Sequence, residues 1–339
     1  MNTSVRKLTE AAILSAVFII ITMIALGTGI GYGLYLDFGV PIIFALIYFR
    51  CDFKYTLMCG ISSTALILFV MGNLAAAILV GQSFVIGILC GYLINKKTGI
   101  FEDLYLGAIL GVLFMVLIDI YARNIIGYSF MEEFQSYIRY LQSQPEFLMN
   151  IMPSISQVDL NLVYYLCIAT FPFGMVLSIY FVSVMAGKRL RLLKGSGKRK
   201  YIMMRTLRSY GGFMNLRENC FYYSLAYVIL VNLLNMASID INNVYLKTIM
   251  TCVEYISYYF VFRDAYMLIG NYLRFKFKNK SLNIIYFVVS LTLLCAYFKL
   301  TLSVLVIVSI YLDKKFELRN KNEHIVNDYV NQLLEIQKI

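Results

Sequence analysis

Apolar runs of membrane-spanning length alternate with short polar stretches along almost the whole chain. A helix needs about 20 mainly apolar residues to cross a bilayer, and fewer where neighbouring helices bury it. The pattern therefore predicts an all-α, polytopic integral membrane protein with about ten transmembrane helices. We expect them at Leu8–Leu26, Leu34–Phe49, Tyr55–Met71, Leu74–Ile94, Leu104–Ala122, Leu160–Ala186, Phe221–Ala237, Tyr245–Tyr272, Asn283–Phe298 and Leu300–Leu312.

Basic residues predict which way round the helices lie. Arg6-Lys7, the loop Arg50–Lys54, Lys96-Lys97 and the block Lys188–Arg208 all fall at the same side of successive crossings. Because cytosolic loops carry the excess of lysine and arginine, this side is predicted to be the cytosol. Both termini are then cytosolic, and we expect a multi-pass inner-membrane protein. The segment Arg123–Asp159 falls outside, where apolar residues at helical spacing predict an amphipathic surface helix: Phe130, Phe134, Tyr137, Ile138 and Leu141.

Composition excludes several classes of protein. Hydrophobic residues make up 60% of the 339 positions, more than soluble domains carry. The net charge of +11 lies mainly at helix ends and accompanies no base-reading motif, so we expect no nucleic-acid partner. The seven cysteines show no CxxC spacing, and the single histidine, His324, lies in the polar tail. We therefore expect no catalytic residues, no metal and no cofactor, and the chain is not expected to be an enzyme.

The block Lys188–Arg208 contains nine basic and no acidic residues and marks the predicted boundary between two halves. We expect a six-helix membrane module over residues 1–190, a basic cytosolic linker over 188–218, a four-helix module over 219–313 and a cytosolic tail over 314–339. Within the linker, Gly195–Arg199 lacks the first glycine and the Ser/Thr of a phosphate-binding loop, so we interpret it as a flexible loop.

The tail is predicted to form an amphipathic helix. Its apolar residues repeat on one side, at Ile325, Val326, Tyr329, Val330, Leu333 and Leu334. Two interpretations stay open: this side docks a protein partner, or it folds back on the chain's own helices.

Polar residues within the apolar runs are the candidate functional residues, because an ionisable group is costly in hydrocarbon and is seldom present without a role. Several lie toward the outer side, where we expect them to line a pocket that binds a solute: Tyr32, Tyr35, Asp37, Asn73, Gln82 and Asp119. The alternative that Asp37 is an ordinary interfacial residue stays open. In the predicted eighth helix, Glu254 and Asp264 favour an internal salt bridge over an ion pathway.

Small residues four positions apart let helices approach closely. They occur at Ala12 and Ala16, at Gly87 and Gly91, and at Gly107 and Gly111.

Three stretches resemble the YybS-like family of uncharacterised bacterial membrane proteins. They are Arg6–Ala16, the glycine-rich loop leading to Phe38-Gly39-Val40-Pro41, and Val306–Asp313. The first six helices of that family look like the substrate-binding S component of energy-coupling-factor (ECF) vitamin transporters.

The resemblance implies a function. In S components an alanine-xxx-alanine face of the first helix contacts a transmembrane coupling subunit, and it maps onto Ala12 and Ala16. The loop that closes over the solute maps onto Gly27–Leu36. The implied protein captures an unidentified small solute from outside and depends on separate coupling and ATPase subunits. It departs from a plain S component in its long outer segment and its four further helices.

Two other functions are kept beside this one. The first is a membrane scaffold or regulatory partner without a solute, which docks a cytosolic or membrane protein through the basic linker and the tail. The second is an ion-coupled transporter that uses Glu254 and Asp264, which the division into six and four helices does not favour.

Overall fold

The computed structural model describes residues 3–29, 33, 35–127, 129–143, 160–237, 243–277 and 280–336, and every regular element in these ranges is a helix. The chain forms two compact units, and each is assembled from separate stretches of sequence. Unit 1 comprises Met1–Lys96, Leu106–Gly197 and Ile241–Val253; unit 2 comprises Lys97–Tyr105, Lys198–Asp240 and Glu254–Ile339.

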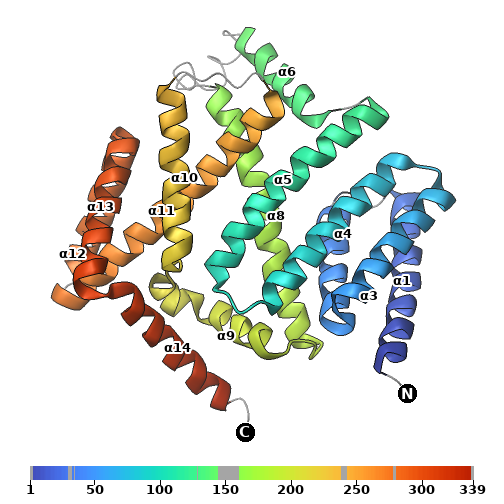
Figure 1. The fold of residues 1–339 in the computed structure, drawn as a ribbon, viewed down its shortest axis with the longest axis horizontal. Coiled ribbons are helices and arrows are strands. Elements are labelled where there is room, and N and C mark those ends of the chain that lie inside the picture. The colour runs from blue at the N-terminus through green and yellow to red at the C-terminus, as the bar shows by residue number, and fades with distance from the viewer. Residues whose placement is uncertain are drawn as a thin grey trace. The chain divides into compact units, whose positions relative to one another are not determined.

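Unit 1 is built on long apolar helices, and Figure 1 shows α1, α3 and α4 side by side. A π-helical turn, η1, leads directly into α3. The elements are α1 (Thr3–Thr28), η1 (Tyr35–Gly39), α3 (Val40–Met71), α4 (Leu74–Asn95), α5 (Ile100–Ile126, of which unit 1 holds the part from Leu106), α6 (Phe130–Ser143) and α8 (Leu160–Arg189).

The helix α3 is a hairpin of two arms, because its backbone leaves the helical conformation at Asp52 (φ 67°, ψ 171°). The contacts of α1 show that the arms are antiparallel. Lys7 of α1 pairs with Asp52, and Thr22 bonds Tyr35 just before the first arm. Ser15 bonds Ser63 in the second arm. These contacts confirm the predicted loop Arg50–Lys54 between the second and third helices.

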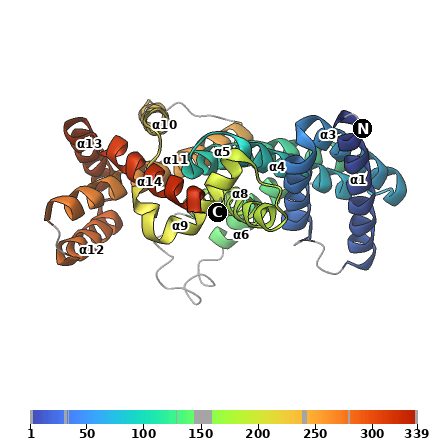
Figure 2. The same ribbon diagram turned by 90° about the horizontal axis from the view of Figure 1, so that it is seen from below.

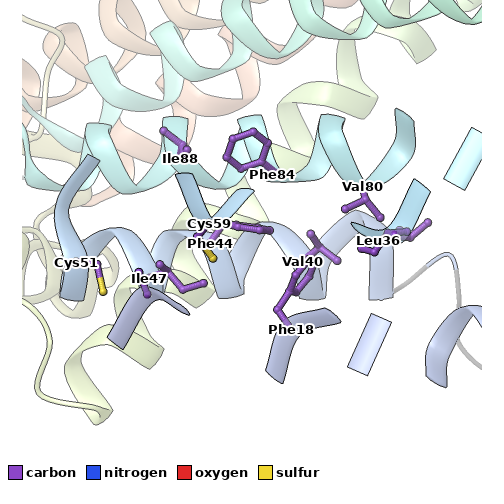
Figure 3. Packing of buried hydrophobic residues seen from close by; sticks show 12 residues of the cluster. Phe18, Leu36, Val40, Phe44, Ile47, Cys51, Cys59, Val80, Phe84 and Ile88 are labelled. Atoms are coloured by element: carbon purple, nitrogen blue, oxygen red, sulfur yellow. The ribbon is translucent and has the colours of Figure 1, made fainter. Parts of the chain in front are cut away.

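Aromatic side chains at the centre of unit 1 join three helices. Phe44 of α3 makes edge-to-face contacts with Phe18 of α1 at 4.9 Å and with Phe84 of α4 at 5.1 Å between ring centroids. Figure 3 shows Phe44 and Phe84 within the surrounding apolar cluster, which includes Val40 and Ile88. Such contacts add about 0.5–1.5 kcal/mol each beyond burial, so they fix how these helices meet.

Glycines Gly87 and Gly91 let α4 approach the first arm of α3. A Cβ added at Gly87 would lie 2.4 Å from the carbonyl oxygen of Pro41, and one at Gly91 would lie 2.9 Å from Cβ of Tyr48. Gly107 and Gly111 likewise face α8, at Val176 and Pro172. Both glycine pairs thus pack inside unit 1.

We expect Gly87→Ala to destabilise the protein by about 1–3 kcal/mol, because the nearest atom belongs to backbone and cannot rotate away. Gly81→Ala, on the same helix, is the control, since its Cβ would meet only Thr64 at 3.9 Å. Thermal unfolding in detergent measures both variants. Equal midpoints for the two would contradict the close approach of α4 to α3.

The helix α6 confirms the predicted amphipathic segment, but its buried side coincides only in part with the predicted one. Met131 and Ile138 are buried, and Phe134 stacks on Tyr164 of α8 at 5.3 Å. Phe130 and Tyr137, which we predicted on the apolar side, are exposed. The reason lies at the start of the helix. Ser129, the residue just before α6, donates a hydrogen bond to Asp119 of α5, and this contact sets the rotation of α6. Leu141 and residues 144–159 of the predicted outer segment lie outside the described residues or side chains.

Unit 2 contains the remaining helices, including α12 and α13, which contact each other and are both labelled in Figure 2. Its elements are α9 (Gly195–Tyr210), the 3₁₀ turn η3 (Gly211–Phe213), α10 (Glu218–Met236), α11 (Val244–Phe277), α12 (Lys280–Ala296), α13 (Phe298–Phe316) and α14 (Leu318–Ile336). Unit 2 also holds the start of α5 through Tyr105. It lacks the start of α9 before Lys198 and the start of α11 before Glu254.

The basic segment is helical, so the predicted flexible loop at Gly195–Arg199 is wrong. Gly195 has a left-handed conformation (φ 42°) and begins α9. Ile202 of α9 is buried with Met214, Val326 and Val330. An apolar partner on α14 therefore stabilises as helix a segment that its charge alone would leave solvated.

The tail folds back on its own chain, which is one of the two interpretations that the sequence left open. Val326 and Val330 of α14 pack on α9, and Tyr329 stacks on Tyr210 with ring centroids 4.3 Å apart. The apolar side of the tail is therefore largely occupied within unit 2.

By length and composition, the described residues contain six helices able to span a membrane. They are Ser4–Thr28, Tyr35–Met71, Leu74–Asn95, Ile100–Ile125, Val163–Arg189 and Glu218–Met236. The hairpin Tyr35–Met71 contains two of the ten predicted crossings. The last three predicted crossings fall on α11, α12 and α13, which are helical but are not among these six spans, so the count of ten stays a prediction.

Candidate functional site

Tyr35 and Asp37 lie on the π-helical turn η1, at the end of unit 1 opposite the Lys7–Asp52 contact. Such turns are rare and are frequently found at functional sites. The hydroxyl groups of Tyr35 and Thr22 of α1 are hydrogen-bonded at 2.9 Å, which ties η1 to α1. The side chain of Asp37 is half-buried and forms no hydrogen bond or ion pair with another described residue.

Gln82 lies at the same level as Asp37. Because Gly87 faces Pro41 and Gly91 faces Tyr48, α4 runs parallel to the first arm of α3. Gln82 lies a little more than one turn before Gly87, and Asp37 of η1 lies about one turn before Pro41. These two residues are therefore at about the same height along the two helices. Gln82 is also half-buried. The structure therefore brings Tyr35, Asp37 and Gln82 to one end of unit 1.

Asp119 lies at this end too, but its carboxylate is already bonded. It is buried and accepts hydrogen bonds from Ser129 Oγ at 2.6 Å and from the backbone N–H of Phe130 at 2.7 Å. Arg123 and Glu132 join the same two helices by an ion pair of 3.0 Å. Asp119 thus holds the first turn of α6 against α5.

Asn73 caps α4. Its side-chain oxygen accepts a hydrogen bond from the backbone N–H of Ala76 at 3.0 Å, and the residue is exposed. This is the ordinary role of asparagine at a helix start. Tyr32 lies outside the described residues, as do residues 30–31 and 34 of the predicted loop Gly27–Leu36.

Ala12 and Ala16, the predicted partner-binding residues, are both exposed on α1. They face away from the core, whereas Ser15 and Phe18 are buried. At the start of α1, Glu10 accepts bonds from Arg6 at 3.1 Å and from Arg50 at 3.0 Å. These bonds hold α1 and the first arm of α3 together beside the exposed alanines.

Unit 2 contains a buried ion pair that the sequence did not predict. Lys200 Nζ of α9 lies 2.6 Å from Asp103 Oδ2 in the first turn of α5, and the side chains are 2% and 0% exposed. The neighbouring Glu102 accepts a hydrogen bond from the backbone N–H of Arg217 at 3.2 Å. Acidic residues are favoured at the start of a helix, where the backbone N–H groups are unpaired. These contacts fasten α9 and the segment before α10 to the start of α5.

A second buried pair fastens the tail. Arg319 of α14 lies 2.6 Å from Asp264 Oδ2 in α11 and 2.8 Å from Asp313 Oδ2 in α13. Asp264 also accepts hydrogen bonds from the backbone of Leu216 at 2.7 Å and from the side chain of Asn215 at 3.2 Å. The expected salt bridge of Asp264 is confirmed, and its partner is the tail.

Glu254, the other acid of α11, is paired with neutral groups. Asn232 of α10 approaches it at 3.4 Å and donates a stronger bond to the hydroxyl of Tyr258 at 2.7 Å. Lys299 donates to Asn232 at 3.2 Å. This polar group joins α10, α11 and α13. Among the described residues, no group of three or more His, Cys, Asp or Glu side chains could hold a metal ion.

The sequence carried only weak signals for the residues that it missed. Asp103 and Lys200 are 97 positions apart, and both lie among charged neighbours that resemble a solvated surface. Arg319 is one of many basic residues in the tail. Only the position of Asp103 in the first turn after Gly99 pointed to a helix start.

Residues 13–191 match the family described as Predicted membrane protein (DUF2232). No curated protein matches the chain, and neither does any solved structure. The matched region covers more than half of the chain and extends from within α1 to the end of α8. The chain belongs to this family of predicted membrane proteins.

Proposed function

We propose that this membrane protein captures a small solute at the outer end of unit 1, as the S component of an ECF transporter does, and depends on separate coupling and ATPase subunits. In this proposal it lies in a bacterial inner membrane with both termini in the cytosol and crosses it about ten times. The four-helix part after residue 219 is an addition to the six-helix module over residues 1–190.

One observation carries the proposal. Asp37 is a half-buried carboxylate in a π-helical turn, level with Gln82, and it has no described protein partner. An ionisable residue within a membrane helix is by default a functional candidate. A cationic or hydrogen-bond-donating group of a solute would satisfy it, with Gln82 and Tyr35 as neutral partners.

The arrangement of α1 supports the same reading. Ala12 and Ala16 are exposed on the part of α1 that precedes Thr22, the residue that bonds the turn carrying Asp37. A coupling subunit that contacted them would leave the outer end accessible to solute.

The test is mass spectrometry of small molecules that co-purify with the gently solubilised protein. We expect Asp37→Asn to reduce the retained solute by about tenfold or more, because a hydrogen bond to a charged group contributes about 1.5–3 kcal/mol. Gln82→Ala should weaken retention less. Asp52→Asn makes the same chemical change at the opposite end and should leave retention unchanged.

Retention that survives Asp37→Asn would contradict the site, and so would a wild-type protein that carries no solute. Asp119→Asn tests whether Asp119 binds the solute or only holds α6. We expect it to raise hydrogen exchange at the start of α6, since the bonds to Ser129 and Phe130 weaken, while the solute is retained.

The scaffold alternative receives less support. It relied on a free apolar side of the tail, and Val326, Tyr329 and Val330 are packed against α9 and η3. A docking function would then rest mainly on the exposed basic residues of the block Lys188–Arg208.

A further inference from the structure

A groove of about 670 Å³ lies within unit 2, where the last turns of α11 and α13 meet the first turns of α14. Its volume is within the range of small-molecule sites, about 300–1,000 Å³. Figure 1 shows α13 leading directly into α14. The lining residues are Tyr272, Phe275, Lys276, Phe316, Leu318, Lys321, His324 and Ile325.

The walls of the groove are apolar. The rings of Tyr272 and Phe316 lie with centroids 5.2 Å apart and form one side. Leu318 is buried, and Ile325 is half-buried. Phe275 remains about half exposed (50%). These surfaces suit a hydrocarbon chain.

The polar lining residues are all basic, and none of the lining residues is acidic. Lys276, Lys321 and His324 are exposed. None of the three forms an ion pair with another residue that the structure describes. Lys276 lies over the ring of Tyr272 at 5.5 Å, which holds its charge at the edge of the apolar wall. The groove therefore joins an apolar slot to a positive rim.

We propose that this groove binds a membrane phospholipid with an anionic headgroup. An acyl chain occupies the slot beside Tyr272 and Phe316, and the headgroup phosphate meets Lys276 and Lys321. Further basic residues, Lys314 and Lys315, follow in the last turn of α13. The positive-inside rule places such helix ends in the cytosolic leaflet, whose anionic lipids attract lysines at the membrane surface.

The experiment is native mass spectrometry of the full chain in a non-ionic detergent. The added lipid is phosphatidylglycerol or, in a separate sample, phosphatidylcholine with the same acyl chains. We expect phosphatidylglycerol to be retained preferentially. The double variant Lys276→Gln/Lys321→Gln should reduce its retention by about tenfold or more, since each lysine attracts the anionic headgroup.

The matched control is Lys96→Gln/Lys97→Gln, which removes the same charge from exposed lysines between α4 and α5 that do not line the groove. It should leave retention unchanged. Ile325→Trp fills the slot without altering charge and should also release the lipid. Equal retention of the two lipids would overturn the proposal, as would equal effects of the two double variants. Displacement by glycerol phosphate at equal concentration would overturn it too, because the apolar slot would then contribute nothing.

Discussion

Replacing Arg319 with alanine should release α14 from the rest of unit 2. Arg319 pairs with both Asp264 and Asp313 and also donates to the carbonyl of Leu216 at 2.8 Å. Its removal leaves the fully buried Asp264 without its cationic partner. Breaking a buried pair in this way costs about 3–5 kcal/mol.

Hydrogen exchange measured by mass spectrometry on peptides of α14 tests this expectation. Exchange should rise over the whole helix, because Val326 and Val330 lose their position on α9. Arg319→Lys should restore only part of the protection, since an ammonium group cannot reproduce the forked contacts of a guanidinium. Arg205→Ala, at an exposed position of α9, is the control. Protection unchanged by Arg319→Ala would show that α14 is held by its apolar contacts alone.

Lys200→Met should destabilise unit 2 by a similar amount, about 3–5 kcal/mol, because it removes the cationic partner of the buried carboxylate of Asp103. The thermal midpoint in detergent measures the loss. Lys198→Met changes an exposed lysine of the same helix and should have little effect.

The double variant Asp103→Leu/Lys200→Met removes both charges of the buried ion pair. It tests whether the stability lost in Lys200→Met comes from the remaining charge of Asp103. Apolar residues of similar size often replace a buried ion pair at little cost. We therefore expect the double variant to recover most of the stability that Lys200→Met loses. A double variant less stable than the single one would mean that Asp103 is held mainly by other groups, such as Thr98.

Much of unit 1 could be predicted because each apolar run forms its own helix. The loop at Asp52, the cap at Asn73 and the amphipathic α6 all follow from local sequence. What local sequence could not give was the rotation of α6, which Asp119 sets from another helix. It also could not give the helical state of α9, where apolar residues distant in sequence outweigh the local charge.

The candidate site was predictable only in part, for a related reason. Burial of a polar group in an apolar run can be read from sequence, but whether another residue already bonds it cannot. Asp37 and Asp119 are alike in the sequence, yet one has no described partner and the other caps α6. For the same reason, the sequence could not predict that Asp103 pairs with Lys200 or that the partner of Asp264 is Arg319.

The first turn of α5 belongs to unit 2, although the rest of that helix belongs to unit 1. A fragment that ended after the family-matched region, near Arg191, would keep Asp103 but lose Lys200. In such a fragment the carboxylate of Asp103 would lack the lysine with which it forms an ion pair in the full chain. Attempts to produce the matched region by itself should therefore end the chain beyond α9 or neutralise Asp103.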